Sequence, residues 1–240
     1  MKDGPHGSNS TFDHFSSHYE EYVEDALKVW VGGDSSEYFL RLKADEMALH
    51  LRRLGLDPMK LTALDVGCGT GVTARMLYLK FAALHGVDSS SGMIERARQL
   101  SLPDVSFQIS DGGRLPFEKN RFDLVYSMSL FHHVPPEYRL RTLAEMVRVV
   151  KPGGWVFSFE HNPLNPLTRL IVSRCPLDQG VELLHAREMT RLCRESNLGQ
   201  IHARFILFFP KQVKFMRSFE SYLSWLPLGG QFYVCGRKLN

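Results

Sequence analysis

The sequence predicts one α/β domain built on a mostly parallel β-sheet with helices on both faces. Short apolar runs alternate with amphipathic stretches of helical periodicity, and glycine-rich turns separate them. Parallel strands need helical crossovers, so this alternation is typical of right-handed βαβ units. The last third of the chain breaks the alternation. Two strand-like segments there are expected to close the sheet with an antiparallel strand near the carboxyl terminus.

Two helices are expected before the first strand. Aromatic residues recur every three or four positions over 12–30, which predicts a helix with one apolar face. A second helix is expected over 37–54, ended by Gly55. We expect residues 1–55 to form a helical cap or lid of the same domain, which then extends over residues 56–240.

The remaining elements follow from the same two periodicities. Strands are expected at 61–67, 84–90, 105–110, 121–129, 154–160, 200–209 and 230–239. Helices are expected at 71–81, 91–100, 137–150, 186–197 and 212–226. A proline-rich segment at 163–177 is expected to be a loop.

Composition restricts the class of function. The 29 Lys and Arg and 26 Asp and Glu residues give a net charge of +3 without a basic stripe, so we expect no nucleic-acid partner. Neither a membrane span nor a secretory signal is present, which favours a cytoplasmic protein without a membrane partner. Two roles stay open for a helix at 211–230: it lies on a membrane surface, or it packs on the sheet and forms a wall of the acceptor pocket. Cysteine and histidine spacings predict no metal.

A glycine-rich turn follows the first expected strand, in "ALDVGCGTGV" at 63–72. Its three glycines leave the main chain bare, so a ligand can approach it closely. Asp88 ends the next strand, where it can bind ribose hydroxyls, and a nicotinamide cofactor would also explain this arrangement. The GxGxG spacing departs from the dinucleotide pattern GxGxxG, and Asp65 suits an ammonium group better than a pyrophosphate.

Five segments in unbroken order resemble the successive motifs of class I S-adenosylmethionine-dependent methyltransferases: "LDVGCGTG", "GVDSS", "ISDGGRLPF", "FDLVYSMSLFHHV" and "VVKPGG". The resemblance covers about 61–160 and is strongest to the small-molecule branch with ubiquinone- and menaquinone-biosynthesis-type enzymes. It implies a Rossmann-like fold with a seven-stranded sheet. It also implies S-adenosylmethionine as the cofactor and a small-molecule acceptor.

The resemblance further implies which residues bind this cofactor. The methionine part is expected at Asp65 and the glycine turn, the ribose at Asp88, and the adenine beside Met93 and Asp111. The expected set is Asp65, Gly67, Cys68, Gly69, Gly71, Asp88, Ser89, Met93, Asp111, Gly112, Ser127 and Met128, with Tyr19 and Tyr22 of the cap near the methionine carboxylate. Simpler roles stay open: Asp88 as a helix cap, Met93 as core, Asp111 as a turn residue and Cys68 as a small residue in the turn.

Candidate catalytic residues follow the fourth and fifth strands. His132 and His133 lie in "SLFHHVPPE", and the ordinary histidine pKa of about 6.5 suits proton removal near neutral pH. A histidine there resembles the base proposed for sugar O-methyltransferases of this branch. We expect His133 as the base, with Glu160 or His161 orienting it or binding the acceptor. Structural packing of the two adjacent histidines is the alternative.

The sequence therefore predicts an enzyme that methylates a small molecule, first at oxygen, next at nitrogen and third at carbon. Two rival functions stay open, a cofactor-binding scaffold without catalysis and a nicotinamide-dependent oxidoreductase. The acceptor stays open among a sugar, a phenol and an amine, and the oligomeric state is also open.

Overall fold

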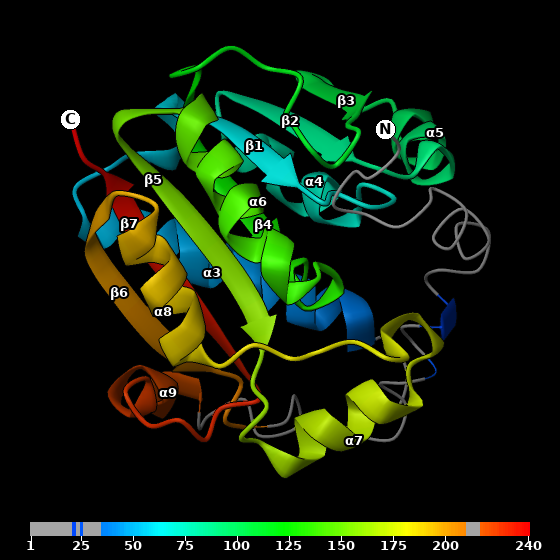
Figure 1. Ribbon diagram of the computed structural model, residues 1–240, viewed down its shortest axis with the longest axis vertical. Helices are drawn as coiled ribbons and strands as arrows, with labels where there is room; N and C mark the ends of the chain where they lie inside the picture. The colour runs from blue at the N-terminus through cyan, green and yellow to red at the C-terminus, as the bar shows by residue number, and fades with distance from the viewer. Residues whose placement is uncertain (1–20, 23–24, 26–34, 210–216) are drawn as a thin grey trace.

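A computed structural model describes residues 21–22, 25, 35–209 and 217–240, and the structural statements below concern these residues. The strands form one seven-stranded sheet in the order β3-β2-β1-β4-β5-β7-β6 (Figure 1). β7 runs antiparallel to both of its neighbours, β5 and β6, while β1 to β5 pair in parallel. The predicted fold class is confirmed.

The expected strands and most expected helices are present, with shifted ends. The strands are β1 (Thr62–Val66), β2 (Ala83–Asp88), β3 (Val105–Ile109), β4 (Phe122–Met128), β5 (Val150–His161), β6 (Leu198–Ile206) and β7 (Gln231–Lys238). The helices are α3 (Ser35–Arg53), α4 (Val72–Leu77), α5 (Ser91–Gln99), α6 (Pro136–Val149), α7 (Pro166–Arg174), α8 (Ala186–Glu195) and α9 (Arg217–Leu223).

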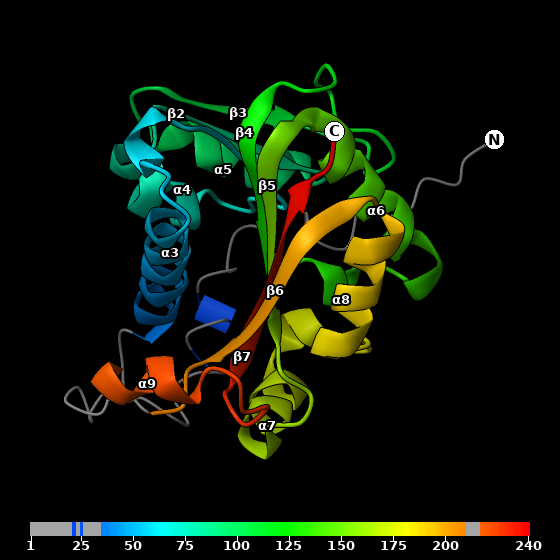
Figure 2. The same ribbon diagram turned by 90° about the vertical axis from the view of Figure 1, so that its left-hand side faces the viewer.

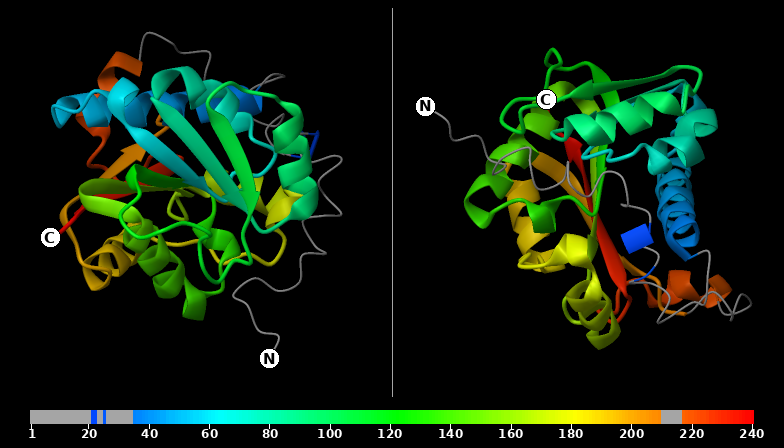
Figure 3. Two further views of the ribbon diagram at one scale, coloured as in Figure 1. Left: turned by 90° about the horizontal axis from the view of Figure 1, so that it is seen from above. Right: turned by 90° about the vertical axis from the view of Figure 1, so that its right-hand side faces the viewer.

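Helices cover both faces of the sheet. α3, α4 and α5 lie on one face, and α6 and α8 lie on the other (Figure 2). The right-hand view of Figure 3 shows the same three layers from the opposite side. Successive side chains of β4 point to opposite faces, so Leu124 and Tyr126 belong to the first apolar cluster and Val125 to the second. The sheet is therefore buried on both sides, as expected for parallel strands.

The expectation of a loop over 163–177 was wrong, because α7 forms within it. The Asn165 side chain accepts hydrogen bonds from the backbone N–H groups of Leu167 and Thr168, which caps the helix. Pro166 occupies the first turn, where a missing N–H costs nothing. The expected helix 12–30 lies largely outside the described residues, and Tyr19 lies outside them. Of the expected helix 212–226, the described part contains α9.

The order of the strands creates a site for a ligand. β1 lies between β2 and β4. The connection after β1 runs toward β2 and the connection after β4 runs toward β5, so the two leave the carboxyl ends of neighbouring strands in opposite directions. A crevice opens at such a switch point, and ligands of open α/β sheets bind there. None of the helices in the described part of the chain has the length and apolar character that a membrane crossing needs.

His50 on α3 makes stability depend on pH. Burial, with the charges of His202, Arg204 and Arg53, lowers the pKa of His50 to about 4, and its Nδ1 lies 2.9 Å from the Tyr233 hydroxyl. In the unfolded chain His50 has its ordinary pKa near 6.5, so between pH 6.5 and 4 it binds a proton there that it does not bind in the folded chain. We expect the free energy of unfolding to decrease as pH falls from 6.5 toward 4, and less so in His50→Gln. Urea unfolding at several pH values measures both slopes, and parallel slopes would contradict the assignment.

Candidate active site

The glycine turn, residues 67–71, connects β1 to α4 and presents bare main chain. Gly67, Gly69 and Gly71 have φ values of 76°, 52° and 78°, a left-handed conformation that side chains with a Cβ rarely adopt. A Cβ on Gly69 would project into open space, and Gly69 lines the pocket at the carboxyl ends of the strands. This turn therefore leaves room for a ligand against its backbone.

Asp88 at the end of β2 fixes the turn. Its Oδ2 accepts a hydrogen bond from the Gly69 N–H at 2.9 Å, and its Oδ1 accepts one from the Ser90 N–H at 3.0 Å. The cap of α5 is Ser90, whose hydroxyl accepts from the Met93 N–H, so Asp88 does not itself cap this helix. Asp88 and Met93 both line the pocket.

The pocket collects many of the expected residues from several loops. Those that line it are Gly67, Gly69, Asp88, Ser89, Met93, Gly112, Met128 and His133. It also contains residues that sequence reasoning missed, among them Ser110, Arg114, Ser129, Leu130, Thr142 and Glu145. Expected residues that do not line it are Asp65, Cys68, Gly71, Asp111, Ser127, Tyr22, His132, Glu160 and His161.

Asp111 and Ser127 have local partners instead. The Asp111 carboxylate accepts hydrogen bonds from the backbone N–H groups of Gly113 and Arg114, and these bonds lower its pKa. This is the turn role that the sequence left open. Ser127 is fully buried, and its hydroxyl lies 3.4 Å from that of Ser158. The strand end that reaches the pocket is one residue further along, at Met128 and Ser129.

Asp65 is a buried carboxylate directly behind the glycine turn. Neither of its oxygens has a hydrogen-bond partner of regular geometry within the described residues. Burial raises its pKa to about 8, although the neighbouring Tyr126 phenol opposes the rise. Near pH 7 this buried carboxyl therefore holds a proton, and a cationic ligand group beside it would favour its charged form.

Lys43 of α3 is a second buried charge that sequence reasoning missed. Its Nζ donates to the Ser129 hydroxyl at 3.2 Å, and burial lowers its pKa to about 8 against the attraction of Glu160 and Asp65. Lys43 is four residues from both Phe39 and Met47 of the buried helix face. This helical spacing was the signal that could have identified it.

Glu160 at the end of β5 organises the loop that follows β4. Its Oε1 accepts hydrogen bonds from the backbone N–H groups of Leu130 and Phe131, at 3.1 and 2.8 Å. Its Oε2 lies 2.7 Å from Nδ1 of His132. Glu160 therefore orients His132. The sequence had predicted that Glu160 or His161 would orient His133 or bind the acceptor. The His161 Nδ1 instead lies 3.3 Å from the Gln231 amide nitrogen.

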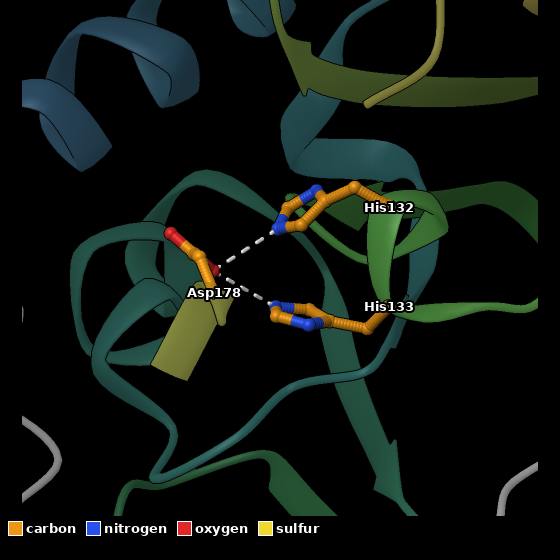
Figure 4. Close-up of side chains that lie close together, drawn as sticks. All are labelled: His132, His133 and Asp178. Atoms are coloured by element: carbon orange, nitrogen blue, oxygen red, sulfur yellow. Dashed lines mark ion pairs between the residues drawn. The ribbon is translucent and has the colours of Figure 1, made fainter. Parts of the chain in front are cut away.

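Asp178 brings the two histidines together. Its Oδ1 lies 3.5 Å from Nε2 of His132 and 3.4 Å from Nε2 of His133, and both rings point toward this carboxylate (Figure 4). We call His132, His133 and Asp178 the histidine cluster. Sequence reasoning missed Asp178 because it lies in "CPLD", directly after the segment 163–177 expected to be a loop, where no motif marks it.

The charges in this region favour the cationic form of His132, in which both ring nitrogens carry a proton. Burial alone would lower the pKa of His132, but Glu160 and Asp178 outweigh it and raise the pKa well above 6.5. Burial and the charge of His132 lower the pKa of His133, so His133 stays neutral near pH 7. Because His133 lines the pocket and His132 does not, the neutral ring is the one that a bound acceptor meets.

Comparison with known proteins identifies the domain. A family model described as a methyltransferase domain matches residues 63–154, which span the glycine turn, Asp88 and both histidines. The chain carries a class I S-adenosylmethionine-dependent methyltransferase domain. S-adenosylmethionine is the cofactor of such domains.

Two curated relatives and one solved structure are similar to this chain, the last in its fold. A 2-methyl-6-phytyl-1,4-hydroquinone methyltransferase of Synechocystis is 31% identical over 59% of this chain and 49% of its own length. The chain thus spans about half the length of that relative. A ubiquinone biosynthesis O-methyltransferase of Paracidovorax citrulli is 26% identical over 72% of this chain and 78% of its own length. A Thermotoga maritima structure, described as a possible histamine N-methyltransferase, has a TM-score of 0.67 at 20% identity, covering 95% and 98% of the two chains.

The methyltransferase domain has a site that fits this cofactor. The space at Gly69 admits a ligand against the main chain, and an ammonium group there would stabilise the charged form of the buried Asp65 behind the turn. Asp88 and Met93 line the same pocket, with a carboxylate for ribose hydroxyls and a thioether for an apolar ring face. We therefore assign the pocket beside the glycine turn as the candidate cofactor site.

Proposed function

We propose that this chain transfers a methyl group from S-adenosylmethionine to an oxygen of a small-molecule acceptor. The main support is that a single pocket contains both the glycine turn with Asp88 and the His133 ring. A cofactor held at the turn and an acceptor held at the histidine would then face each other. Alignment of two reactants in this way contributes roughly 7–11 kcal/mol to catalysis.

Bound S-adenosylmethionine would supply an electrophilic methyl group. The chain has to hold the acceptor in line with that methyl, exclude water and remove the hydroxyl proton. We place proton removal at the pocket wall formed by His133, with His132, Glu160 and Asp178 behind it. His133 suits this place because it is neutral near pH 7 and reaches the pocket.

Oxygen is the first choice of acceptor atom, with nitrogen and carbon after it. The names of the two curated relatives refer to a hydroquinone and to ubiquinone biosynthesis, which favours a phenolic or quinol acceptor over a sugar or an amine. Incubation with radiolabelled S-adenosylmethionine and a panel of phenols, sugars and amines tests the proposal. Label on an oxygen supports it, and label on an amine nitrogen selects the second choice.

The two rival functions make different predictions in the same preparation. A non-catalytic scaffold would be stabilised against heat by S-adenosylhomocysteine but label no acceptor. A nicotinamide enzyme would be stabilised by NADH instead. Thermal shift measurements with both compounds, followed by the labelling panel, therefore separate the three functions.

We also propose that residues 1–55 act as a cap or lid over the bound cofactor and the space beside it. Tyr22 is one of the few described residues before α3, and it packs against the small apolar cluster of Cys175 and Leu177. This contact of Tyr22 supports a cap that reaches the segment carrying Asp178. A cover there would exclude water during transfer.

Asp88 is expected to contribute directly to cofactor affinity. Asp88→Ala removes the acceptor for ribose hydroxyls and releases the Gly69 N–H, so S-adenosylhomocysteine binding should weaken by roughly 1.5–3 kcal/mol. Isothermal titration calorimetry measures this change. Asp104→Asn, which alters an exposed carboxylate, is the matched control and should leave affinity unchanged. An Asp88→Ala variant with wild-type affinity would remove Asp88 from the ribose site.

A further inference from the structure

We propose that His132, His133 and Asp178 bind one divalent transition-metal ion of the Zn²⁺ type. Each residue offers one ligand atom, and these three atoms all lie within 4.8 Å of one another (Figure 4). Two imidazole nitrogens and one carboxylate oxygen form a donor set that suits Zn²⁺ and similar ions better than Mg²⁺ or Ca²⁺. The cysteine and histidine spacings predicted no metal, since Asp178 joins the two adjacent histidines from a distant segment of the chain.

The two distances from Asp178 to the histidines resemble those between metal ligands. Asp178 Oδ1 lies 3.5 Å from His132 Nε2 and 3.4 Å from His133 Nε2. Ligand atoms about 2.0–2.1 Å from a tetrahedral Zn²⁺ are separated from one another by about 3.3–3.4 Å. The contact between His132 Nδ1 and Glu160, at 2.7 Å, has instead the length of a strong hydrogen bond.

Glu160 prepares His132 for this role. An ion that binds Nε2 displaces the proton there, and the neutral His132 that results donates its Nδ1–H to Glu160. Glu160 is itself fixed by the N–H groups of Leu130 and Phe131. Pairs of this kind, in which a carboxylate orients a metal-binding histidine, are common in metal sites. The ring orientation is therefore set before an ion arrives.

The place of the cluster suggests what the ion would do. Three protein ligands leave a tetrahedral position open, as in catalytic zinc sites. His133 lines the pocket in which we place the acceptor, so an oxygen of the acceptor can occupy that position. A bound ion would lower the pKa of an oxygen ligand, so the acceptor's proton would leave to solvent, and His133 would act as a metal ligand and not as the base. This role, unlike binding of the ion, rests on the proposed function.

Direct titration of the full chain tests the site without any acceptor. After dialysis against a chelator, calorimetry with Zn²⁺ should give one site per chain, and Mg²⁺ should give no heat. Asp178→Asn should weaken Zn²⁺ binding about tenfold or more, since loss of even an outer partner of a metal ligand costs that much. Asp104→Asn is the matched control at an exposed carboxylate and should bind as the wild type does.

Two further measurements keep the test decisive. Co²⁺ added to the wild type should give a visible absorption spectrum of a low-coordinate site, and His133→Gln should abolish it even if Asp178→Asn folds poorly. S-adenosylhomocysteine affinity, measured in the same samples, should be unchanged in folded variants and reports on the cofactor site separately. Absence of Zn²⁺ binding, or equal binding by the folded Asp178→Asn variant, would show an ion pair only and overturn the proposal, whatever the methyl-transfer assay gives.

Discussion

Replacing His133 by alanine is expected to lower the turnover number about 100-fold or more. His133 reaches the pocket from the loop after β4, next to Ser129 and Leu130. Removing a positioned group that handles the acceptor's proton costs about 10²–10⁴-fold. The glycine turn and Asp88 make their hydrogen bonds without His133, so the affinity for S-adenosylhomocysteine should stay at the wild-type value.

The measurement is a comparison of initial rates with calorimetric affinities for the two proteins. His185→Ala is the matched control, because His185 is exposed and caps α8 without a side-chain hydrogen bond. Its turnover should equal that of the wild type. A His133→Ala enzyme that keeps most of its turnover would leave alignment alone as the source of catalysis.

Arg139→Met is expected to cause the largest loss of stability, about 3–5 kcal/mol in the free energy of unfolding. Arg139 is fully buried on α6 and ties three segments together. Its Nε donates to the backbone carbonyls of Phe131 and Val134, which enclose the two histidines. Its terminal nitrogens donate to the Glu182 carbonyl at 2.6 Å and to the Glu188 carboxylate at 2.9 Å. Methionine fills similar space but leaves these acceptors without a donor.

Urea unfolding followed by circular dichroism measures the loss. Arg141→Met, on the same helix but exposed, is the control and should change stability by no more than about 0.5 kcal/mol. A loss below about 1 kcal/mol for Arg139→Met would mean that the buried guanidinium contributes little.

The strands of the sheet could be predicted because their signal is local. Each strand is a short apolar run beside a turn, and burial on both faces makes such runs conspicuous. α7 could not be predicted from apolar periodicity, since its prolines indicated a loop. Its own signal was a different one, an asparagine cap followed by a first-turn proline at 165–166.

The residues of the candidate site also fall into two groups, those that a local motif predicts and those that only the fold brings together. Gly69, Asp88 and Met93 lie in short motifs, so their approach to one pocket was predictable. Lys43 enters the site from a helix before the first strand, and Asp178 enters it from the segment between β5 and β6. No spacing along the chain indicates that such residues meet. Only the packing of α3 and the path after α7 bring them to the ends of β4 and β5.

The position of β7 has a consequence for how the molecule is made. β7 lies between β5 and β6, although it follows both in the chain, and the described part of β6 has no other strand beside it. Until residues 231–238 have been synthesised, β5 keeps an open edge and β6 has nothing to pair with. The nascent chain therefore carries an unpaired edge from the completion of β5 until β7 is made, which is the kind of surface that chaperones protect and that aggregation exploits.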